Sequence, residues 1–309
     1  MVPFDLHMNG DFMDMHLHSC YSDDGEYSPK ELVNLCKKAG IRVMAVADHN
    51  CTKACGPALS AAEEAGIRSV PAVEIDCTFR GTDLHVLGYG IRYESQDFAK
   101  IEERIAEQSE KASHERLNKT RALGFFLTEE ELDEETAGNY WKHVWAGETF
   151  GKLLLAKEEY RDSPLLLPYR PGGKRSDNPY VNFYWDYYSQ GKPCHAAMEY
   201  PSFEETLSVI HRNGGKAVLA HPGNNLKGRE ELLEPMRELG LDGIEAFCSY
   251  HGEKEREFYA AYARAHGLIL TCGSDFHGKV KPAVAIGGHG CMLLEEEMER
   301  EIQRLLEKA

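Results

Sequence analysis

The sequence predicts an α/β fold whose strands are parallel, arranged either as a barrel or as a doubly wound sheet. Strand-like and helix-like segments alternate from the N-terminus to about residue 92, and the same alternation returns from about residue 195 to residue 309. Residues 93–194 instead have a mostly helical pattern. We therefore expect a discontinuous α/β domain formed by residues 1–92 and 195–309, with residues 93–194 as a helical insertion that caps the site.

Hydrophobic patterning and helix-boundary residues justify the elements before the insertion. The segment SPKELVNLCKKAG predicts a helix over 28–40, with Ser28 as N-cap, Pro29 in the first turn, Glu31 completing a capping box and Gly40 as terminator. The segment ACGPALSAAEEAG predicts a second helix. Apolar runs predict strands over 12–19, 41–49, 67–77 and 83–91.

The elements after the insertion repeat this order, while the insertion itself differs. Predicted helices cover 203–215, 229–240 and 255–267, and predicted strands cover 216–221, 241–247 and 268–275. Inside the insertion, residues 95–123 have the pattern of one long charged helix, and Thr128 with Glu131 forms a capping box at the start of another. We expect the aromatic stretch YVNFYWDYY to pack the insertion on the α/β domain.

Composition narrows the class of protein. The formal charge of −16 argues against a nonspecific grip on nucleic acid, although bound cations can reverse the local field for a small anionic substrate. The nine cysteines form no Cys-x-x-Cys pair, which predicts reduced thiols in a cytoplasmic protein. The N-terminal MVPFDLHMNGDF lacks the features of a signal peptide, and no apolar stretch is long enough to span a membrane.

Metal-affine side chains stand at the ends of six predicted strands. One such histidine or aspartate is usually a helix cap or a satisfied core residue, but six strands ending this way favour a metal centre. The carboxyl ends of parallel strands form one face, so these groups should converge. They are His16, His18, Asp23, Asp48, His49, Glu74, Asp76, His85, His221, Asp275 and His277.

The types of ligand indicate the metals and the chemistry. Imidazole and carboxylate without thiolate suit Zn²⁺, Mn²⁺ or Fe²⁺, and this many ligands suit two or three ions. Clustered ions can activate a bridging water and neutralise the oxygens of a phosphate ester. The sequence contains no P-loop, Gly-x-Gly-x-x-Gly or Ser/His/Asp arrangement that would indicate a rival mechanism.

Six motifs resemble, in order, those of the PHP (polymerase and histidinol phosphatase) phosphoesterases: DMHLHSCYSDD, AVADHN, AVEIDC, HVLGYG, AVLAHPG and CGSDFHG. The resemblance implies a distorted (β/α)7 TIM-like barrel with its metal centre at the strand ends. The insertion resembles that of the subgroup acting on nucleotide, oligonucleotide or cyclic sugar phosphates. In that subgroup an Arg-x-His often begins a helix, and the corresponding stretch here, GETFGKLLL, lacks the histidine.

The resemblance also implies a ligand set and a nucleophile. One ion would be held by His16, His18, Glu74 and Asp275. A second would share Glu74 and take His85 and His221, and a third would take Asp23, His49 and His277. A hydroxide bridging two ions would attack phosphorus, with Glu74, Asp275 and His277 as the catalytic residues. Asp48 and Asp14 would orient ligands, although Asp48 is equally well explained as a helix cap.

Candidate substrate contacts lie in loops. His195 precedes the helix that leads to AHPG, where related proteins present a residue to the phosphate, and an ordinary loop histidine is an equal alternative. His251 follows a strand end, and it either faces the site or starts a helix. Lys174 and Arg175 could clamp an anion, although a solvated loop explains them better. The aromatic residues of the insertion could instead stack a base or sugar.

We expect a metal-dependent hydrolase of small organic phosphates, such as nucleotide, sugar or cyclic phosphates. The alternatives within this class are an oligoribonuclease or nucleotide bisphosphatase, whose partner would be a short oligonucleotide, and a histidinol-phosphate phosphatase, which ranks lower because it usually lacks this insertion. Other classes are a non-catalytic metal-binding regulatory module and a hydrolase of carbon–nitrogen bonds. Glu74 on the third strand, the SDFH ending and the absence of a candidate carbamylated lysine on a middle strand favour phosphorus over carbon–nitrogen bonds. The complete ligand set argues against the regulatory module.

Overall fold

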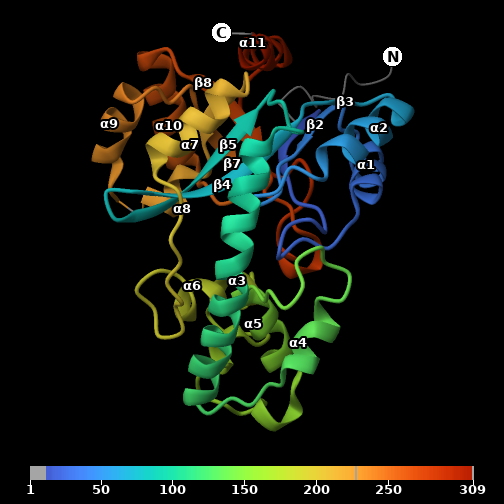
Figure 1. Cartoon of the computed structure of the whole chain (residues 1–309), viewed down its shortest axis with the longest axis vertical. Helices are drawn as coiled ribbons and strands as arrows, with labels where there is room; N and C mark the ends of the chain where they lie inside the picture. Colours follow the sequence, from blue (N-terminus) through green and yellow to red (C-terminus); the bar gives the residue numbers. More distant parts are fainter. Residues whose placement is uncertain (1–11, 227, 308–309) are drawn as a thin grey trace, which may run out of the picture.

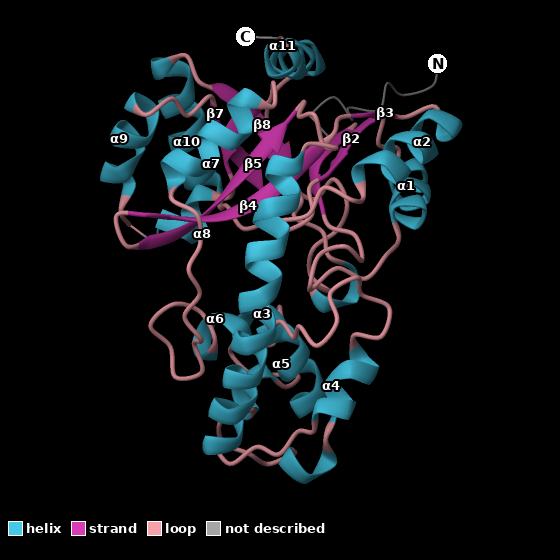
Figure 2. Ribbon diagram, in the orientation of Figure 1, coloured by secondary structure: helices cyan, strands magenta, loops and turns pink. Residues whose placement is uncertain are grey.

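The structure, a computed structural model, describes residues 12–226 and 228–307. The segment MVPFDLHMNGD, part of the stretch predicted to lack a signal peptide, lies outside the described residues. The described part has an α/β fold with a helical lobe below it (Figures 1 and 2). None of its helices combines the length and apolar character needed to cross a membrane.

The strands form two sheets. A three-stranded parallel sheet has the order β1-β2-β3, from β1 (Met13–Leu17), β2 (Val43–Val46) and β3 (Arg68–Ser69). A five-stranded sheet has the order β4-β5-β6-β7-β8, from β4 (Ala72–Phe79), β5 (Thr82–Tyr89), β6 (Lys216–Leu219), β7 (Gly243–Cys248) and β8 (Ile269–Gly273).

The expectation of uniformly parallel strands is wrong at β5, which runs antiparallel to both of its neighbours. Only Arg80 and Gly81 separate β4 from β5, and so short a connection can join only antiparallel strands. As a result, the start of β5 lies beside the end of β4, and Asp76 pairs with His85. His85 therefore reaches the expected face from the beginning of a strand.

Two isolated bridges connect the edges of the two sheets. Leu17 at the end of β1 pairs with Phe276 after β8, and His49 after β2 pairs with Glu74 in β4. Both pairs join segments that carry metal-affine residues, and Glu74 is the third residue of β4. The described residues form no closed sheet, so the distorted (β/α)7 barrel stays a prediction.

Helices cover the sheets. They are α1 (Pro29–Lys38), α2 (Cys55–Ala65), α7 (Phe203–Arg212), α8 (Pro222–Leu226), α9 (Leu233–Glu238), α10 (Glu253–His266) and α11 (Glu295–Leu306). Those expected around the strands form in the predicted order, whereas α8 and α11 were not predicted. The capping box predicted for α1 is confirmed, because the Ser28 hydroxyl accepts the Glu31 N–H and the Glu31 carboxylate accepts the Ser28 N–H. The helix expected over 229–240 is shorter and follows a 3-10 turn, Glu230–Leu232.

The insertion contains α3 (Gln96–Ala122), α4 (Glu129–Glu135), α5 (Gly147–Ala156) and α6 (Pro179–Tyr187). The long α3 runs from the sheets into the helical lobe (Figure 1). Phe98 and Ile101 near its start pack in the core of the α/β part, whereas Leu117 packs in a separate core. That second core also contains Trp145, Phe150, Leu154, Phe183 and Tyr188. The aromatic stretch thus builds the insertion's own core rather than only its contact with the sheets.

Candidate metal centre

Glu74 lies at the middle of the site. Its carboxylate is fully buried, and its two oxygens lie 3.0–3.2 Å from imidazole nitrogens of five histidines: His16, His18, His49, His85 and His221. These histidines come from β1, β5 and the segments after β1, β2 and β6. The predicted convergence of distant strand ends therefore exists in the fold.

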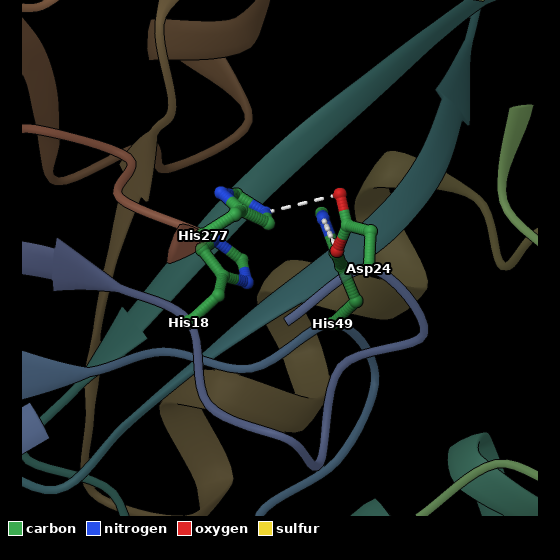
Figure 3. Close-up of side chains that lie close together, drawn as sticks. All are labelled: His18, Asp24, His49 and His277. Carbon is green, nitrogen blue, oxygen red and sulfur yellow. Dashed lines mark ion pairs between the residues drawn. The ribbon is translucent and has the colours of Figure 1, made fainter. Parts of the chain in front are cut away.

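Three overlapping groups of side chains have the spacing of metal ligands, with donor atoms within 4.8 Å of one another. The first group contains His16, His18, Glu74 and Asp275, and the second contains His49, Glu74 and His85. The third group contains His18, Asp24, His49 and His277, which point toward one another in Figure 3. His221 lies beside the second group, because its Nε2 is 3.0 Å from Glu74 Oε1.

Possible metal-ligand atoms that lack hydrogen-bond partners show that these groups fit divalent cations. Several buried atoms in the site make no hydrogen bond within the described part of the chain: His16 Nε2, His18 Nε2, His49 Nδ1, Glu74 Oε2, Asp24 Oδ1, Asp76 Oδ1 and Asp275 Oδ1. Burying a polar atom without a partner is costly, and here the unpaired atoms face one another rather than being scattered. A nitrogen and oxygen donor set of this kind matches Mn²⁺, Fe²⁺ or Zn²⁺.

Buried hydrogen bonds orient the imidazole ligands. Ser22 Oγ donates to Asp48 and accepts from His18 Nδ1 at 2.9 Å, so the lone pair of His18 is on Nε2, which faces Glu74 and Asp275. Glu245 does the same for His16 by accepting from Nδ1 at 2.9 Å. Asp48 thus orients a ligand through Ser22, as expected. Sequence reasoning missed Glu245, whose only signal was an acidic residue inside the apolar strand LDGIEAF.

Close backbone packing sets the approach of β1 to β8. Asp14 accepts N–H groups of Ser274 and Gly287, which ties β1 to the segments after β8. A Cβ on Gly273 would lie 2.2 Å from the Cβ of His16, so only glycine allows this approach. Asp275 itself has a positive φ of 57°, a conformation that non-glycine residues rarely adopt and that often marks functional sites.

Asp24, rather than the predicted Asp23, belongs to the third group. Asp24 Oδ2 lies 3.2 Å from His277 Nε2, and Asp24 Oδ1 lies 3.9 Å from His49 Nε2. Asp23 lines the cavity above the site, as Asp24 does, but it belongs to none of the three ligand groups of the described residues. The two aspartates are adjacent, and the turn after β1 directs their side chains differently. Asp76, which was noted at its strand end, lies 3.3 Å from His85 Nε2.

Electrostatic interactions between neighbouring imidazoles and carboxylates keep most side chains of the site charged. Burial disfavours charge on His16, but Glu245, Glu74 and Asp275 outweigh it and hold the His16 pKa well above its usual value. Burial likewise disfavours ionisation of Glu74, but the surrounding imidazoles hold its pKa well below the usual range. His18 differs, because burial and the neighbouring His277 and His49 lower its pKa to about 3.

Two adjoining cavities lead to the site. The first, of about 140 Å³, is lined by His49, His85, Asp275, Lys281 and, from the insertion, Glu148. The second, of about 290 Å³, shares Arg116, Tyr184 and Trp185 of the insertion with the first. The insertion therefore forms a wall of the cavity above the ligand groups. Burial and the nearby Asp24 raise the pKa of Glu148 to about 8.

The residues predicted to contact substrate lie in different parts of the structure. His195 lines the second cavity. His251 is buried away from it, donating from Nδ1 to the Ala246 carbonyl and accepting the Gly223 N–H on Nε2, so both ring nitrogens are used by the backbone. Arg175 pairs with Asp186 within the insertion. Lys174 and Arg175 line neither cavity.

Besides Glu245, sequence reasoning missed three further residues of the site: Tyr250, Lys281 and Glu148. Tyr250 Oη donates to Asp275 Oδ2 at 2.5 Å, and Lys281 Nζ lies 2.9 Å from the same oxygen. Glu148 comes from the start of α5. Tyr250 follows a strand end, which was a usable signal, but nothing in the sequence marks Lys281 or Glu148 as site residues.

Comparison with known proteins gives relatives over most of the chain. The family model described as PHP domain matches residues 14–309. The 3′,5′-nucleoside bisphosphate phosphatase of Chromobacterium violaceum is 28% identical, covering 86% of this chain and 87% of that protein. The 5′-3′ exoribonuclease Rnm of Escherichia coli is 28% identical, covering 85% and 84%. The phosphoribosyl 1,2-cyclic phosphate 1,2-diphosphodiesterase of Eggerthella lenta is 26% identical, covering 86% and 94%.

Two solved structures share the fold. One is named as a proposed metal-dependent phosphoesterase from Bifidobacterium adolescentis, with a TM-score of 0.76, 23% identity and 96% coverage of both chains. The other is named as an amidohydrolase from Chromobacterium violaceum, with a TM-score of 0.74, 23% identity and coverage of 94% of this chain and 96% of that chain. At this identity the likeness concerns the fold.

Proposed function

Because the chain belongs to the PHP domain family, we propose that it is a metal-dependent phosphoesterase that hydrolyses small organic phosphates. The observation that carries this proposal is the buried Glu74 carboxylate, surrounded by five histidines and by unpaired donor atoms beneath a cavity. The names of the relatives agree with the predicted phosphoric ester hydrolase, since each describes a phosphatase, an exoribonuclease or a phosphodiesterase.

The proposed ligands follow the geometry of the groups. His16, His18, Glu74 and Asp275 would hold one divalent ion, and His49, Glu74, His85 and His221 would hold a second. Ions held there supply Lewis-acid chemistry, which activates water and neutralises phosphate oxygens. The chain's own part is to orient the ligands through Ser22 and Glu245 and to keep Asp275 in place through Tyr250.

The non-reacting part of the substrate would lie in the second cavity. Arg116 is half-buried and lines both cavities, so its guanidinium could pair with an anionic group of the substrate. Tyr184 and Trp185 offer ring surfaces for a base or sugar, and His195 lies on the same wall. We expect these residues to affect substrate affinity more than metal binding.

We also propose the domain division at residues 93 and 194, with a discontinuous barrel-type domain and a capping insertion. Its support is that the insertion has a hydrophobic core of its own and that two bridges connect the sheet edges. All nine cysteines are free, which agrees with the predicted reducing, cytoplasmic location.

A second candidate is the cleavage of nucleotide bisphosphates or short oligonucleotides. The combination of Arg116 with Tyr184 and Trp185 favours it, because a phosphate and a base would find matching partners. Glu148 argues in the other direction, because its carboxyl lines the cavity in the stretch where related proteins have an Arg-x-His. A smaller sugar or cyclic phosphate would avoid this carboxyl.

A substrate screen tests the proposal. Mn²⁺-loaded protein is incubated with phosphate monoesters, diesters and cyclic esters, and released phosphate and alcohol are measured. We expect turnover that is lost in His16→Ala and Glu74→Gln, whereas Lys111→Met, an exposed change on α3, retains it. A protein that binds Mn²⁺ but cleaves none of the esters would instead support the regulatory metal-binding module.

A further inference from the structure

Lys281 is a buried cation inside the metal centre. It follows the 3-10 turn Gly278–Val280, and only 7% of its surface is exposed. Its Nζ lies 2.9 Å from Asp275 Oδ2, 3.3 Å from His277 Nε2 and 3.9 Å from Asp24 Oδ2. The ammonium is therefore placed beside the third group, which contains His18, Asp24, His49 and His277.

The contact with His277 uses the lone pair that a metal ion would need. His277 Nδ1 lies 2.8 Å from the carbonyl oxygen of Asp275, which can only accept, so Nδ1 carries the proton. In a neutral ring Nε2 is then an acceptor, and the Lys281 ammonium donates to it. A cation could coordinate Nε2 only after this contact is broken.

The Lys281 ammonium also lies near a close contact between two side chains of the third group. Asp24 Oδ2 lies 3.2 Å from His277 Nε2, and Figure 3 shows the two side chains facing each other. Lys281 Nζ lies 3.9 Å from the same Asp24 oxygen, so a positive charge of the chain already faces this carboxylate. The position of Lys281 is well held, because Asp275 binds its ammonium and the ring of Tyr250 lies 5.8 Å from Nζ.

In the first group, which contains His16, His18, Glu74 and Asp275, Lys281 contacts only Asp275 among the described residues, and it does so on one oxygen. Lys281 and Tyr250 both bind Oδ2 of Asp275, which leaves Oδ1 of Asp275 facing His16 and His18. The unpaired atoms His16 Nε2, His18 Nε2 and Glu74 Oε2 lie on that side. The chain therefore leaves the ligand atoms around Glu74 open. In the third group it places its own ammonium at His277 Nε2 and near Asp24 Oδ2, whereas Asp24 Oδ1 makes no hydrogen bond within the described residues.

We propose that Lys281 takes the place of a divalent cation in the third group, so that the native centre holds two ions rather than three. This inference rests on the proposed metal centre, and it makes Lys281 the residue that limits the number of ions. A fixed positive charge beside Asp24 and His277 repels an incoming cation, and it occupies the lone pair of His277 Nε2.

Metal content tests the inference directly. Wild-type protein, Lys281→Met and the control Lys279→Met are dialysed against Mn²⁺, and bound Mn²⁺ per chain is measured by plasma mass spectrometry. Lys279 is a suitable control because it is two positions away but exposed, and it pairs with Glu26 at the surface. We expect two ions in the wild type and in Lys279→Met, and three in Lys281→Met.

A second variant separates charge from packing. Lys281→Arg keeps the positive charge and should keep two ions, and circular dichroism and thermal unfolding of each variant show that it is folded. If Lys281→Met does not fold, Lys281→Gln replaces it. Three ions in the wild type, or two in the folded uncharged variant, would overturn the inference while leaving the metal centre intact. A wild type that binds no Mn²⁺ would overturn the proposed centre itself.

Discussion

Glu245 joins two ligand-bearing strands through one buried carboxylate: Oε1 lies 2.9 Å from His16 Nδ1, and Oε2 accepts the backbone N–H of His221 at 2.9 Å. The carboxylate contributes nothing to the three ligand groups, yet it fixes the ring of one proposed ligand and the backbone of another. Such partners normally orient metal ligands and set their basicity.

Replacing Glu245 should therefore weaken metal binding without removing a ligand. In Glu245→Gln the amide cannot accept both N–H groups, and the charge that polarises His16 is lost. We expect Mn²⁺ affinity to fall by about 10- to 100-fold, measured by calorimetric titration. Glu257→Gln, an exposed change on α10, is the matched control. Equal affinities for the two variants would contradict the role given to Glu245.

The thermal stability of the metal-free protein and the stabilisation caused by bound metal should change with pH in opposite directions. The pKa values of His16, His49 and His85 are raised by nearby carboxylates in the folded state, although burial opposes this. These histidines therefore stabilise the folded protein fully below the pKa of an unfolded histidine, about 6.5. This stabilisation is lost as the pH rises toward their higher pKa values in the folded state. Metal ions need the same nitrogens unprotonated.

Between pH 6 and pH 8 we therefore expect the thermal midpoint of metal-free protein to decrease. Over the same interval, the increase in midpoint caused by excess Mn²⁺ should become larger. Differential scanning calorimetry with and without Mn²⁺ measures both quantities. A Mn²⁺-induced increase that shrinks toward pH 8 would show that proton release from these histidines is not linked to binding.

His251 should act on stability rather than on metal content. Both of its ring nitrogens are paired with the backbone, and its ring stacks on Tyr259. His251→Ala leaves a buried carbonyl and a buried N–H unpaired, so we expect a loss of about 1–3 kcal/mol in the free energy of unfolding. Urea denaturation measures the loss, with exposed His266→Ala as control. A fall in bound Mn²⁺ in folded His251→Ala would argue for a role in the metal centre.

Arg116 should affect substrate binding. Arg116→Met removes the proposed partner of a substrate anion, and a lost charged hydrogen bond of about 1.5–3 kcal/mol corresponds to a KM about tenfold higher or more. We expect KM to change more than kcat, and Mn²⁺ content to stay the same. Lys111→Met on the same helix provides the comparison. An unchanged KM in Arg116→Met would place the substrate outside the second cavity.

Asp23 and Asp24 should differ in their effect on bound Mn²⁺ once the charge of Lys281 is removed. In a Lys281→Met background, adding Asp24→Asn should remove the third Mn²⁺, because Asp24 faces His277 and His49. Adding Asp23→Asn should leave it bound, because Asp23 belongs to none of the three ligand groups. Metal analysis of the two double variants decides between the residue inferred from the motif and the one placed by the fold.

Local sequence patterns were sufficient to predict most of the helices and strands. The Ser28 and Thr128 capping boxes form as predicted, because a capping box depends on residues only three positions apart. The direction of β5 was not predicted, since the prediction assumed repeating βα units and overlooked that Arg80 and Gly81 allow only a hairpin. The packing of Phe183 and Tyr188 into a separate core likewise depends on partners distant in the chain.

By itself, the sequence determined which donor types stand at the strand ends, and therefore that His16, His18, Glu74 and Asp275 would meet. This followed from chain topology, because parallel strands bring their carboxyl ends to one face. Only the tertiary structure decided the choice between Asp23 and Asp24, the support from Glu245 and the presence of Lys281. Those depend on side-chain direction and on contacts between segments as far apart as residues 24 and 281, which no local pattern records.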